Sequence, residues 1–247
     1  MFRIPKKTIP PLLRGLKIVG AVIATLQAIT VTVIVSIDQL RKLRQTGKPG
    51  GYPQINNEPI RVDRSRLKIY TDGENLYRDM LAAIEGAKER VFFETFIWKS
   101  DEIGQQFKDA LIRAAERGAE VYIIWDHFGN LVVSPRFFRF PRLKNLHVLR
   151  YSLKHTARDH RKILLVDSKV GFVGGYNIGS YYLENQWRDT HLRISGSNVW
   201  ELESAFLDFW NYAQKWHLRL KKVRDPRAKS WNSKIQACVN DPKRLLF

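Results

Sequence analysis

Residues 159–177 hold side chains whose types and spacing suit chemistry on a phosphodiester. They follow the pattern H-x-K-x4-D-x6-G-G-x-N. An imidazole beside a fixed ammonium suits an anionic substrate, because the ammonium lowers the pKa of the imidazole and keeps it neutral and nucleophilic. A glycine pair permits close backbone approach, and an asparagine amide can donate to a phosphate oxygen. The residues concerned are His160, Lys162, Asp167, Gly174, Gly175 and Asn177.

This arrangement indicates a phosphodiester site without a metal, in which positioning and positive charge lower the barrier. The chain has one cysteine, Cys238, so neither an internal disulfide nor a cysteine-based metal site is expected. An isolated H-x-K is more simply explained as a surface histidine in a basic cluster. The complete pattern is far more specific, and it favours the catalytic interpretation.

The apolar run after Lys162 ends at Val166 and is too short for a helix, so it predicts a buried strand over 162–166. Side chains two residues apart share one face of a strand, which would point His160 and Lys162 the same way. Helical and strand patterns alternate through the rest of this region, and they predict an α/β sandwich, a mixed sheet with helices on its faces. The predicted helices are 72–88, 101–117 and 198–215, and the other predicted strands are 90–98, 119–125, 146–151, 170–173 and 190–194.

The N-terminal part contains a run of 20 residues, 18–37, with no charged side chain. A helix of this length spans roughly 30 Å, the thickness of the hydrocarbon core of a bilayer, and a transmembrane helix is the favoured interpretation. A signal peptide, or a helix that is buried or lies in the membrane interface, are the alternatives. The predicted organisation is a basic tail (1–17), this helix, a linker rich in Gly, Pro and Asn (38–63), a globular domain (64–217) and a basic tail (218–247) that could be a truncated remnant.

The formal net charge of +18 implies an anionic partner, either nucleic acid or a membrane surface rich in anionic lipid. Charge alone does not separate the two. The segment 136–142 interleaves phenylalanines with arginines, which suits a membrane interface. The alternative, held equally open, is that its phenylalanines complete the core.

The H-x-K-x4-D pattern resembles the HKD signature of the phospholipase D superfamily. Residues 187–194 (WRDTHLRI) resemble an element of the bacterial cardiolipin synthase branch, and 174–179 (GGYNIG) and 158–162 (RDHRK) also fit that branch. The resemblance implies a phospholipase D-like α/β sandwich that acts without a metal or organic cofactor.

The resemblance also implies roles for single residues. His160 would be the nucleophile that forms a phosphatidyl-histidine intermediate, or the partner general acid. Lys162 and Asn177 would bind phosphate oxygens, and Asp167 would support the site. Asp189 would orient the catalytic imidazole or, as an equal alternative, pair with a neighbouring arginine. Two strand acids, Glu94 and Asp126, are expected in structural or supporting positions, and His191 is expected to be a half-buried strand histidine.

The family's active site needs two facing HKD elements, whereas this sequence has one. The chain would therefore pair as a homodimer or need a second HKD half. The expected function is that of a membrane-anchored phosphatidyltransferase of cardiolipin synthase type, acting on phosphatidylglycerol, with a single-pass anchor and the domain on the cytoplasmic side. The alternatives are a homodimeric phosphodiesterase, either phospholipase or nuclease, and an inactive half that binds anionic membrane. The predicted membrane helix favours lipid over nucleic acid.

Overall fold

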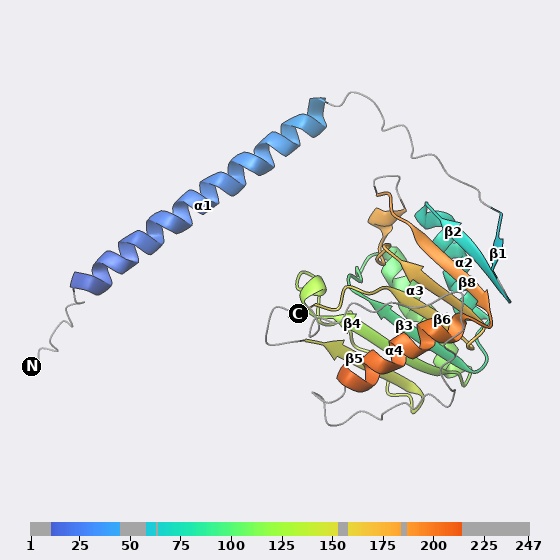
Figure 1. Cartoon of the computed structure of the whole chain (residues 1–247). Helices are drawn as coiled ribbons and strands as arrows, with labels where there is room; N and C mark the ends of the chain where they lie inside the picture. The colour runs from blue at the N-terminus through green and yellow to red at the C-terminus, as the bar shows by residue number, and fades with distance from the viewer. Residues whose placement is uncertain (1–10, 45–57, 63, 153–157, 184–186, 214–247) are drawn as a thin grey trace, which may run out of the picture. The chain divides into compact units, whose positions relative to one another are not determined.

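The computed structural model describes residues 11–44, 58–62, 64–152, 158–183 and 187–213. The predicted C-terminal tail, 218–247, lies outside them, as do most residues of the predicted N-terminal tail and linker. The chain divides into two compact units, Met1–Gly50 and Gly51–Phe247. The first unit holds one long helix, and the second holds an α/β domain (Figure 1).

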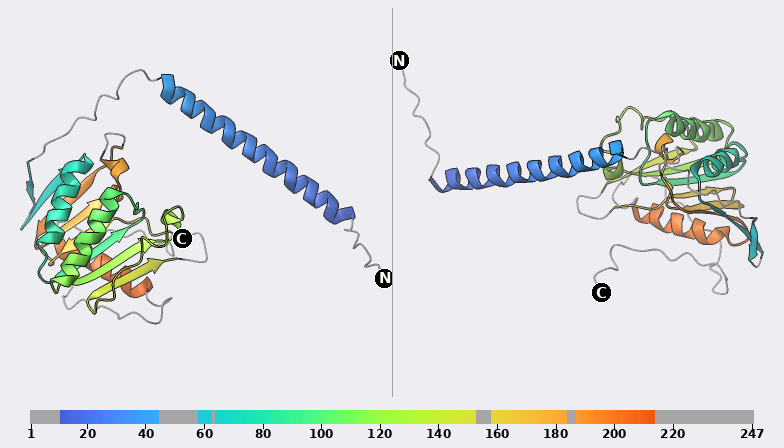
Figure 2. Two further views of the ribbon diagram at one scale, coloured as in Figure 1. Left: turned by 180° about the vertical axis from the view of Figure 1, so that it is seen from behind. Right: turned by 90° about the horizontal axis from the view of Figure 1, so that it is seen from above.

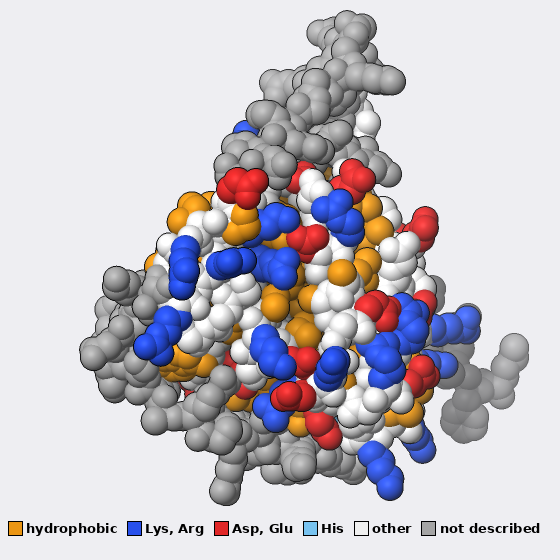
Figure 3. Space-filling view, turned by 90° about the vertical axis from the view of Figure 1, so that its right-hand side faces the viewer, with side chains coloured by type: hydrophobic (Ala, Val, Ile, Leu, Met, Phe, Trp, Pro, Cys, Tyr) orange, Lys and Arg blue, Asp and Glu red, His pale blue; other side chains and the backbone are white. Residues whose placement is uncertain are grey.

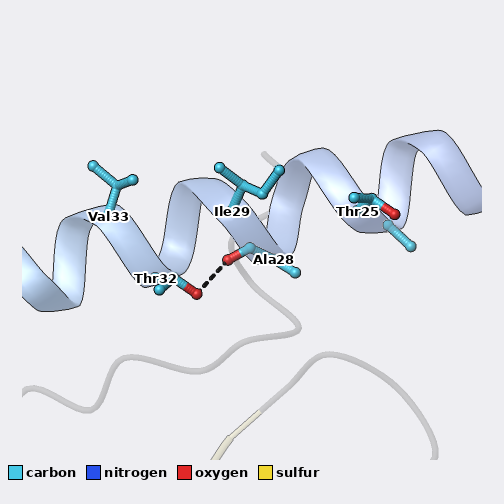
Figure 4. A pocket seen from close by; sticks show the side chains of 6 residues that line it. Thr25, Ala28, Ile29, Thr32 and Val33 are labelled. Carbon is cyan, nitrogen blue, oxygen red and sulfur yellow. Dashed lines mark hydrogen bonds between the residues drawn. The ribbon is translucent and has the colours of Figure 1, made fainter.

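Helix α1 (Pro11–Arg44) extends beyond the predicted span, 18–37, at both ends. Its apolar part, Gly15–Ile37, has 23 residues and contains an 18-residue window with a mean hydropathy of 2.3, so it is a candidate for a membrane span. At 1.5 Å per residue it measures about 34 Å, enough for the hydrocarbon core. Threonine hydroxyls within it donate to carbonyls four residues earlier, as Thr32 does to Ala28 over 2.8 Å, so these polar groups are satisfied without water. Figure 4 shows the shallow hollow beside this pair, which α1 alone lines.

In the described part of the second unit, eight strands form one mixed sheet in the order β1-β2-β8-β7-β6-β3-β4-β5. Strands β3, β4 and β5 are parallel, and the other neighbouring pairs are antiparallel. The strands are β1 (Ile60–Val62), β2 (Ser65–Tyr70), β3 (Arg90–Thr95), β4 (Glu120–Asp126), β5 (Leu146–Tyr151), β6 (Ile163–Val166), β7 (Val170–Gly174) and β8 (His191–Gly196). The helices are α2 (Gly73–Glu85), α3 (Glu102–Glu116) and α4 (Val199–Ala213), with short 3-10 turns η1 (Phe128–Asn130) and η2 (Ser180–Tyr182).

The sheet separates two helical layers: α2 and α3 cover one face and α4 covers the other (Figure 2). Side chains alternate along a strand, so one strand contributes to the core on both faces of the sheet. On β3, Phe93 belongs to the core under α2 and α3, whereas Phe92 packs under α4, where its ring lies 4.7 Å from that of Phe206. The prediction of an α/β sandwich with a mixed sheet is confirmed.

Two aspartates start the helices of the first layer. Asp72 accepts the backbone N–H of Asn75 at the start of α2, and Asp101 accepts that of Gly104 at the start of α3. Each satisfies a donor that the helix itself leaves free. Asp101 also accepts the backbone N–H of Ser180 over 2.7 Å, which ties α3 to η2.

Most predicted elements are present with boundaries that differ by a few residues. Strands β1 and β2 were not predicted, and β1 lies inside the segment expected to be linker. Figure 3 shows one side of the domain, where basic and acidic side chains are interspersed with hydrophobic ones. The charge on that side is therefore mixed and does not form a single basic patch.

Candidate active site

The residues of the motif gather at one edge of the sheet. Strands β3, β4 and β7 end there and strands β6 and β8 begin there, as the registers of the paired strands require. We call this the motif edge. His160 and Lys162 lie just before β6, Asn177 follows β7, and Asp189 precedes β8. The topology thus brings these predicted site residues to one place.

His160 and Lys162 share the ring of Phe96 as a neighbour. The imidazole centroid of His160 lies 4.6 Å from the Phe96 centroid, and the Lys162 Nζ lies 5.2 Å from it. Lys162 is buried and donates from Nζ to the backbone carbonyl of His160 over 2.6 Å, whereas His160 is exposed. Strand β6 begins only at Ile163, so both residues precede it. The two side chains therefore lie on the same side, as predicted, because both contact the ring of Phe96 and not because they alternate along a strand.

The surroundings shift both pKa values in the direction that phosphoryl chemistry needs. Withdrawal from water lowers the pKa of His160, and the Lys162 ammonium lowers it further. Burial lowers the pKa of Lys162 to about 8, although nearby carboxylates, Asp159 first, act to raise it. At neutral pH the imidazole is therefore free to attack, while the lysine is still mostly charged.

The two chain neighbours of His160 are held inside the domain. Asp159 is buried, and its backbone N–H donates to the Asp126 carboxylate over 2.9 Å. Arg161 pairs with Glu94 on β3 over 2.5 Å and with Asp159 over 3.2 Å. Its guanidinium also donates to the carbonyl of Ala205 on α4. The backbone on each side of His160 is thus fixed to three different elements.

Glu94 and Asp159 are two buried carboxyl groups that share one guanidinium. Burial raises the pKa of Glu94 well above its ordinary value, and the neighbouring Asp159 raises it further, although Arg161 acts against both. Two carboxylates so close cannot both ionise easily. Glu94 lies in a supporting position: it pairs with Arg161, the chain neighbour of His160, and not with His160 itself.

Asn177 is buried and already engaged by the protein. Its Oδ1 accepts the backbone N–H of Ile97 over 3.1 Å, and its Nδ2 donates to the hydroxyl of Tyr182 over 3.3 Å. The amide has a second hydrogen, so one further donation remains available for a phosphate oxygen. Its main visible role is to fix the segment after β3, which carries Phe96.

The glycine pair makes room for strand β8. A Cβ on Gly174 would lie 2.5 Å from the Cα of His191, and a Cβ on Gly175 would lie 1.9 Å from a carboxylate oxygen of Asp189. The close approach predicted for a phosphate is therefore made by the chain itself. Any larger side chain at either position would displace residues of the motif edge.

Asp189 lies near the motif without a direct bond to it. Its carboxylate accepts the backbone N–H of Thr190 over 2.7 Å and the indole N–H of Trp187 over 3.4 Å. Its charge acts to raise the pKa of both His160 and Lys162. Among the hydrogen bonds between described residues, none joins Asp189 to His160, so the predicted orienting contact is not formed in this structure.

His191 is more deeply buried than expected, with 1% of its surface exposed. Burial, followed by the charge of Lys162, lowers its pKa to about 3, so the ring is neutral. Neither ring nitrogen has a hydrogen-bond partner among the described residues. The ring lies against Gly174, immediately beside the motif edge.

Asp167, the motif carboxylate that was expected to support the site, lies at the opposite end of β6. Its carboxylate accepts the backbone N–H groups of Lys88, Glu89 and Arg90, the last two over 2.8 and 2.9 Å. Burial acts to raise the pKa of Asp167, but these three donors outweigh it and lower the pKa. The residue fastens the loop before β3 and has no contact with the motif edge among the described residues.

Asp167 and Ser168 also form the turn between β6 and β7. Both have positive φ, 51° and 54°, and Lys169 N–H donates to the carbonyl of Val166. This bond closes a β-turn with Asp167 and Ser168 at its two central positions, positive φ at both is the mark of a type I′ turn, and Asp tolerates it.

Comparison with known proteins agrees with this geometry. A family model described as the PLD-like domain of cardiolipin synthase matches residues 80–210, more than half of the chain. The chain belongs to this family. The matched part of the PLD-like domain includes the whole motif edge from Glu94 to His191.

The relatives are cardiolipin synthases that are much longer than this chain. The major cardiolipin synthase ClsA of Bacillus subtilis is 31% identical over 66% of this chain and 36% of its own length. Cardiolipin synthase 1 of Bacillus cereus is 35% identical over 62% of this chain and 32% of its own length. The chain thus spans about a third of these relatives. Among solved structures, a phospholipase D family member, Nuc from Salmonella typhimurium, has a TM-score of 0.46 at 19% identity, over 66% of this chain and 99% of that chain.

The aromatic segment of the PLD-like domain completes the core. Phe138 stacks on Trp125 with ring centroids 3.8 Å apart, and Phe137 lies edge-on to Trp98 at 5.6 Å. Phe140 also packs against Trp98. The alternative in which these phenylalanines belong to the core is therefore correct, and they are not free to enter a membrane.

Sequence reasoning missed three residues of this site. Phe96 lies in an aromatic run that predicts only a strand. Arg161 resembles a member of a basic surface cluster, and Asp159 is an acid within the same cluster. Only the position of Arg161 between His160 and Lys162 signalled that it would face the opposite way. Among the described residues no group of three or more His, Cys, Asp or Glu could hold a metal ion.

Proposed function

We propose that this chain is a membrane-anchored phosphatidyltransferase of the cardiolipin synthase type. One observation carries the proposal: an exposed histidine of lowered pKa, His160, lies beside the buried ammonium of Lys162 at the motif edge. The names of the relatives supply the product class, cardiolipin, and the family resemblance implies phosphatidylglycerol as the substrate. The net charge of +18 favours such anionic lipids.

The chemistry proceeds in two displacements at phosphorus. A ring nitrogen of His160 attacks the phosphorus of one phosphatidylglycerol, the bond to the head-group glycerol breaks, and the glycerol oxygen takes a proton. The hydroxyl of a second phosphatidylglycerol then attacks the phosphorus, gives up its proton, and the bond to nitrogen breaks. Two phosphatidylglycerols become cardiolipin and glycerol. Lys162, with the free N–H of Asn177, would hold the phosphate oxygens.

The proton in both steps needs a second group, which the family supplies from a second HKD element. The sequence has one such element, so we propose that a second copy of the chain, or a second HKD half, completes the site. Asp189, whose charge already acts on His160, would gain its orienting bond when the site is completed.

We assign α1 as a single-pass anchor in the cell membrane, with the domain on the cytoplasmic side. The length and hydropathy of Gly15–Ile37 support this role. An anchor keeps the site within reach of lipids that do not leave the bilayer. Arg and Lys flank both ends of the span, so the side rests on the family analogy alone.

Hydrolysis by a homodimer is the second candidate, and the exposure of His160 favours it. Transfer requires that water be kept from the phosphohistidine, and an exposed imidazole admits water unless a partner or the bilayer covers it. Phosphatidic acid would then replace cardiolipin as the product.

The test is turnover of labelled phosphatidylglycerol by the full chain in lipid nanodiscs. Cardiolipin with an equal amount of glycerol is expected from the wild type and is lost in His160→Ala. His147→Gln is the matched control, since His147 lies on the edge strand β5 and pairs with Glu120. Phosphatidic acid as the sole product would favour hydrolysis, and cleavage of single-stranded DNA without lipid turnover would overturn the proposal.

A further inference from the structure

Exposed apolar side chains collect at the motif edge. Outside α1, six large hydrophobic residues of the described chain are exposed, and five of them follow β4 or β7 or precede β8. They are Ile60, Phe128, Leu131, Val132, Tyr181 and Trp187. Ile60 is the exception and lies on the edge strand β1. Three of the five lie within Phe128–Val132, and Val132 is 85% exposed. We call Phe128, Leu131 and Val132 the apolar tip.

The tip is held in this exposed position by the residues beneath it. The buried side chain of Asn130 donates to the carbonyls of Phe96 and Asp126 and accepts the backbone N–H of Trp98. The Asp126 carboxylate accepts the backbone N–H of Gly129 over 3.0 Å. The turn is therefore anchored by its polar members, while its apolar members face outward.

The same anchors connect the tip to the candidate nucleophile. Asp126 binds Gly129 through one carboxylate oxygen and the backbone of Asp159, the residue before His160, through the other. Phe96, whose carbonyl holds Asn130, has its ring against His160. The position of the tip relative to His160 is thus fixed by short, buried contacts.

The chain that follows the tip is rich in basic residues. Residues 127–158 hold seven Lys or Arg and no Asp or Glu. Arg158 lies over the ring of Phe128 at 3.9 Å, and Arg136, Arg139 and Arg142 are exposed. Exposed apolar side chains with a cation stacked on one of them, and further cations close by in the chain, suit the boundary between the head groups and acyl chains of an anionic bilayer.

We propose that the apolar tip inserts into the surface of a bilayer containing anionic phospholipid and so presents the motif edge to its substrate. The inference rests on the proposed function and adds a second point of membrane contact, separate from α1.

The test uses the full chain with Cys238→Ser as background, so that one introduced cysteine carries an environment-sensitive fluorophore. Val132→Cys probes the tip. Glu89→Cys is the matched control, because Glu89 is exposed beside Asp167, at the opposite edge of the sheet. Each protein is placed in vesicles of phosphatidylcholine with or without phosphatidylglycerol, and quenching by shallow nitroxide lipids is measured.

With phosphatidylglycerol present, the label at 132 is expected to shift to the blue and to be quenched at least about twofold more strongly than the label at 89. Equal quenching at the two positions would overturn the proposal. Protection of the label in detergent that grows with protein concentration would also overturn it, since a second copy of the chain would then cover the tip.

Activity separates failure of this inference from failure of the proposed function. The double variant Leu131→Gln, Val132→Gln is expected to lose at least about tenfold in turnover of bilayer phosphatidylglycerol and to keep turnover of a short-chain, detergent-dispersed analogue. An equal loss on both substrates would place the tip in the fold or the chemistry and not in membrane contact. If wild type is active and the label does not insert, only the present inference fails.

Discussion

His160 and Asp167 belong to one sequence motif but lie at opposite ends of strand β6. The four residues of the strand alone span roughly 13 Å along its direction. Asp167 therefore serves the motif through the fold: it fastens the loop before β3, the strand that delivers Glu94 and Phe96 to the motif edge. Its three hydrogen bonds and its positive φ explain why an aspartate suits the position.

We expect Asp167→Asn to reduce stability and to spare the chemistry. Asparagine tolerates the positive φ, but its NH2 group would face backbone donors, and the loss should be about 1–3 kcal/mol in the free energy of unfolding. Urea unfolding in detergent measures this loss, and kcat per folded molecule should stay within about threefold of wild type. A large fall in kcat with unchanged stability would contradict this assignment.

The same substitution has a defined pH dependence. The pKa of Asp167 is lowered in the folded state, so its stabilising contribution is present above the ordinary value of 3.8 and is lost as pH falls through the lower folded value. The stability difference between wild type and Asp167→Asn should therefore be large at pH 7 and shrink towards pH 3. A difference independent of pH would exclude the ionised carboxylate as its source.

Arg161 is expected to act as a positioning residue for His160. Lysine cannot bridge Glu94, Asp159 and the Ala205 carbonyl at once, so Arg161→Lys should lower kcat by at least about tenfold with little change in KM. Steady-state kinetics in nanodiscs measures both. If Arg161→Lys only destabilises the domain and leaves kcat per folded molecule intact, the residue has a purely structural role.

Asp159→Asn is a conservative substitution of the other chain neighbour of His160, and it is the counterpart of Arg161→Lys. Its amide oxygen can still accept from Arg161, and removal of one carboxylate relieves the repulsion that raises the pKa of Glu94. We expect activity close to wild type and equal or higher stability. Strong inactivation by Asp159→Asn would show that the negative charge itself is needed beside His160.

The pH dependence of kcat/KM should reflect the ionisation of Lys162. Since burial lowers its pKa to about 8, phosphate binding should weaken as pH rises through 8, and kcat/KM should fall. Arginine stays charged, so Lys162→Arg should lower the maximum rate but move the alkaline fall to higher pH. An alkaline fall at the same pH in both proteins would assign it to another group.

His191 should contribute a pH dependence to stability. Its folded pKa is lowered from 6.5 to about 3, so below pH 6.5 the unfolded chain takes up a proton that the folded domain does not. Stability should fall as pH falls from 6.5 towards 3, and His191→Leu should flatten this fall. Because neither ring nitrogen is hydrogen-bonded to a described residue, the substitution should cost less than about 1 kcal/mol at pH 7. A much larger cost would reveal a hydrogen bond to the ring.

The sequence was a good guide to the core elements and to the motif edge. The buried strands follow apolar runs, and the residues of the motif that flank β6 and β7 meet because the antiparallel ladder brings those ends together. Strand β2 was missed although Leu67 and Ile69 alternate with Arg66 and Lys68, which is the pattern of a half-buried strand.

The contacts between distant elements could not be read from the sequence. No local pattern tells that Gly175 faces Asp189 or that Arg161 reaches α4, since these neighbours are set by strand order and helix packing. The motif predicted a supporting role for Asp167, but not that its carboxylate would accept backbone N–H groups of the loop before β3. Motif membership predicted which residues matter but not where each of them acts.

The most direct test of the central claim is mass spectrometry of the peptide containing His160 after the full chain has turned over phosphatidylglycerol. The reaction is stopped in alkaline denaturant, where a phosphorus–nitrogen bond survives. The two-displacement mechanism predicts a phosphatidyl adduct on His160 that appears with the substrate, decays as cardiolipin forms, and is absent from His160→Ala. Cardiolipin formation without an adduct on His160, or undiminished in His160→Ala, would contradict it.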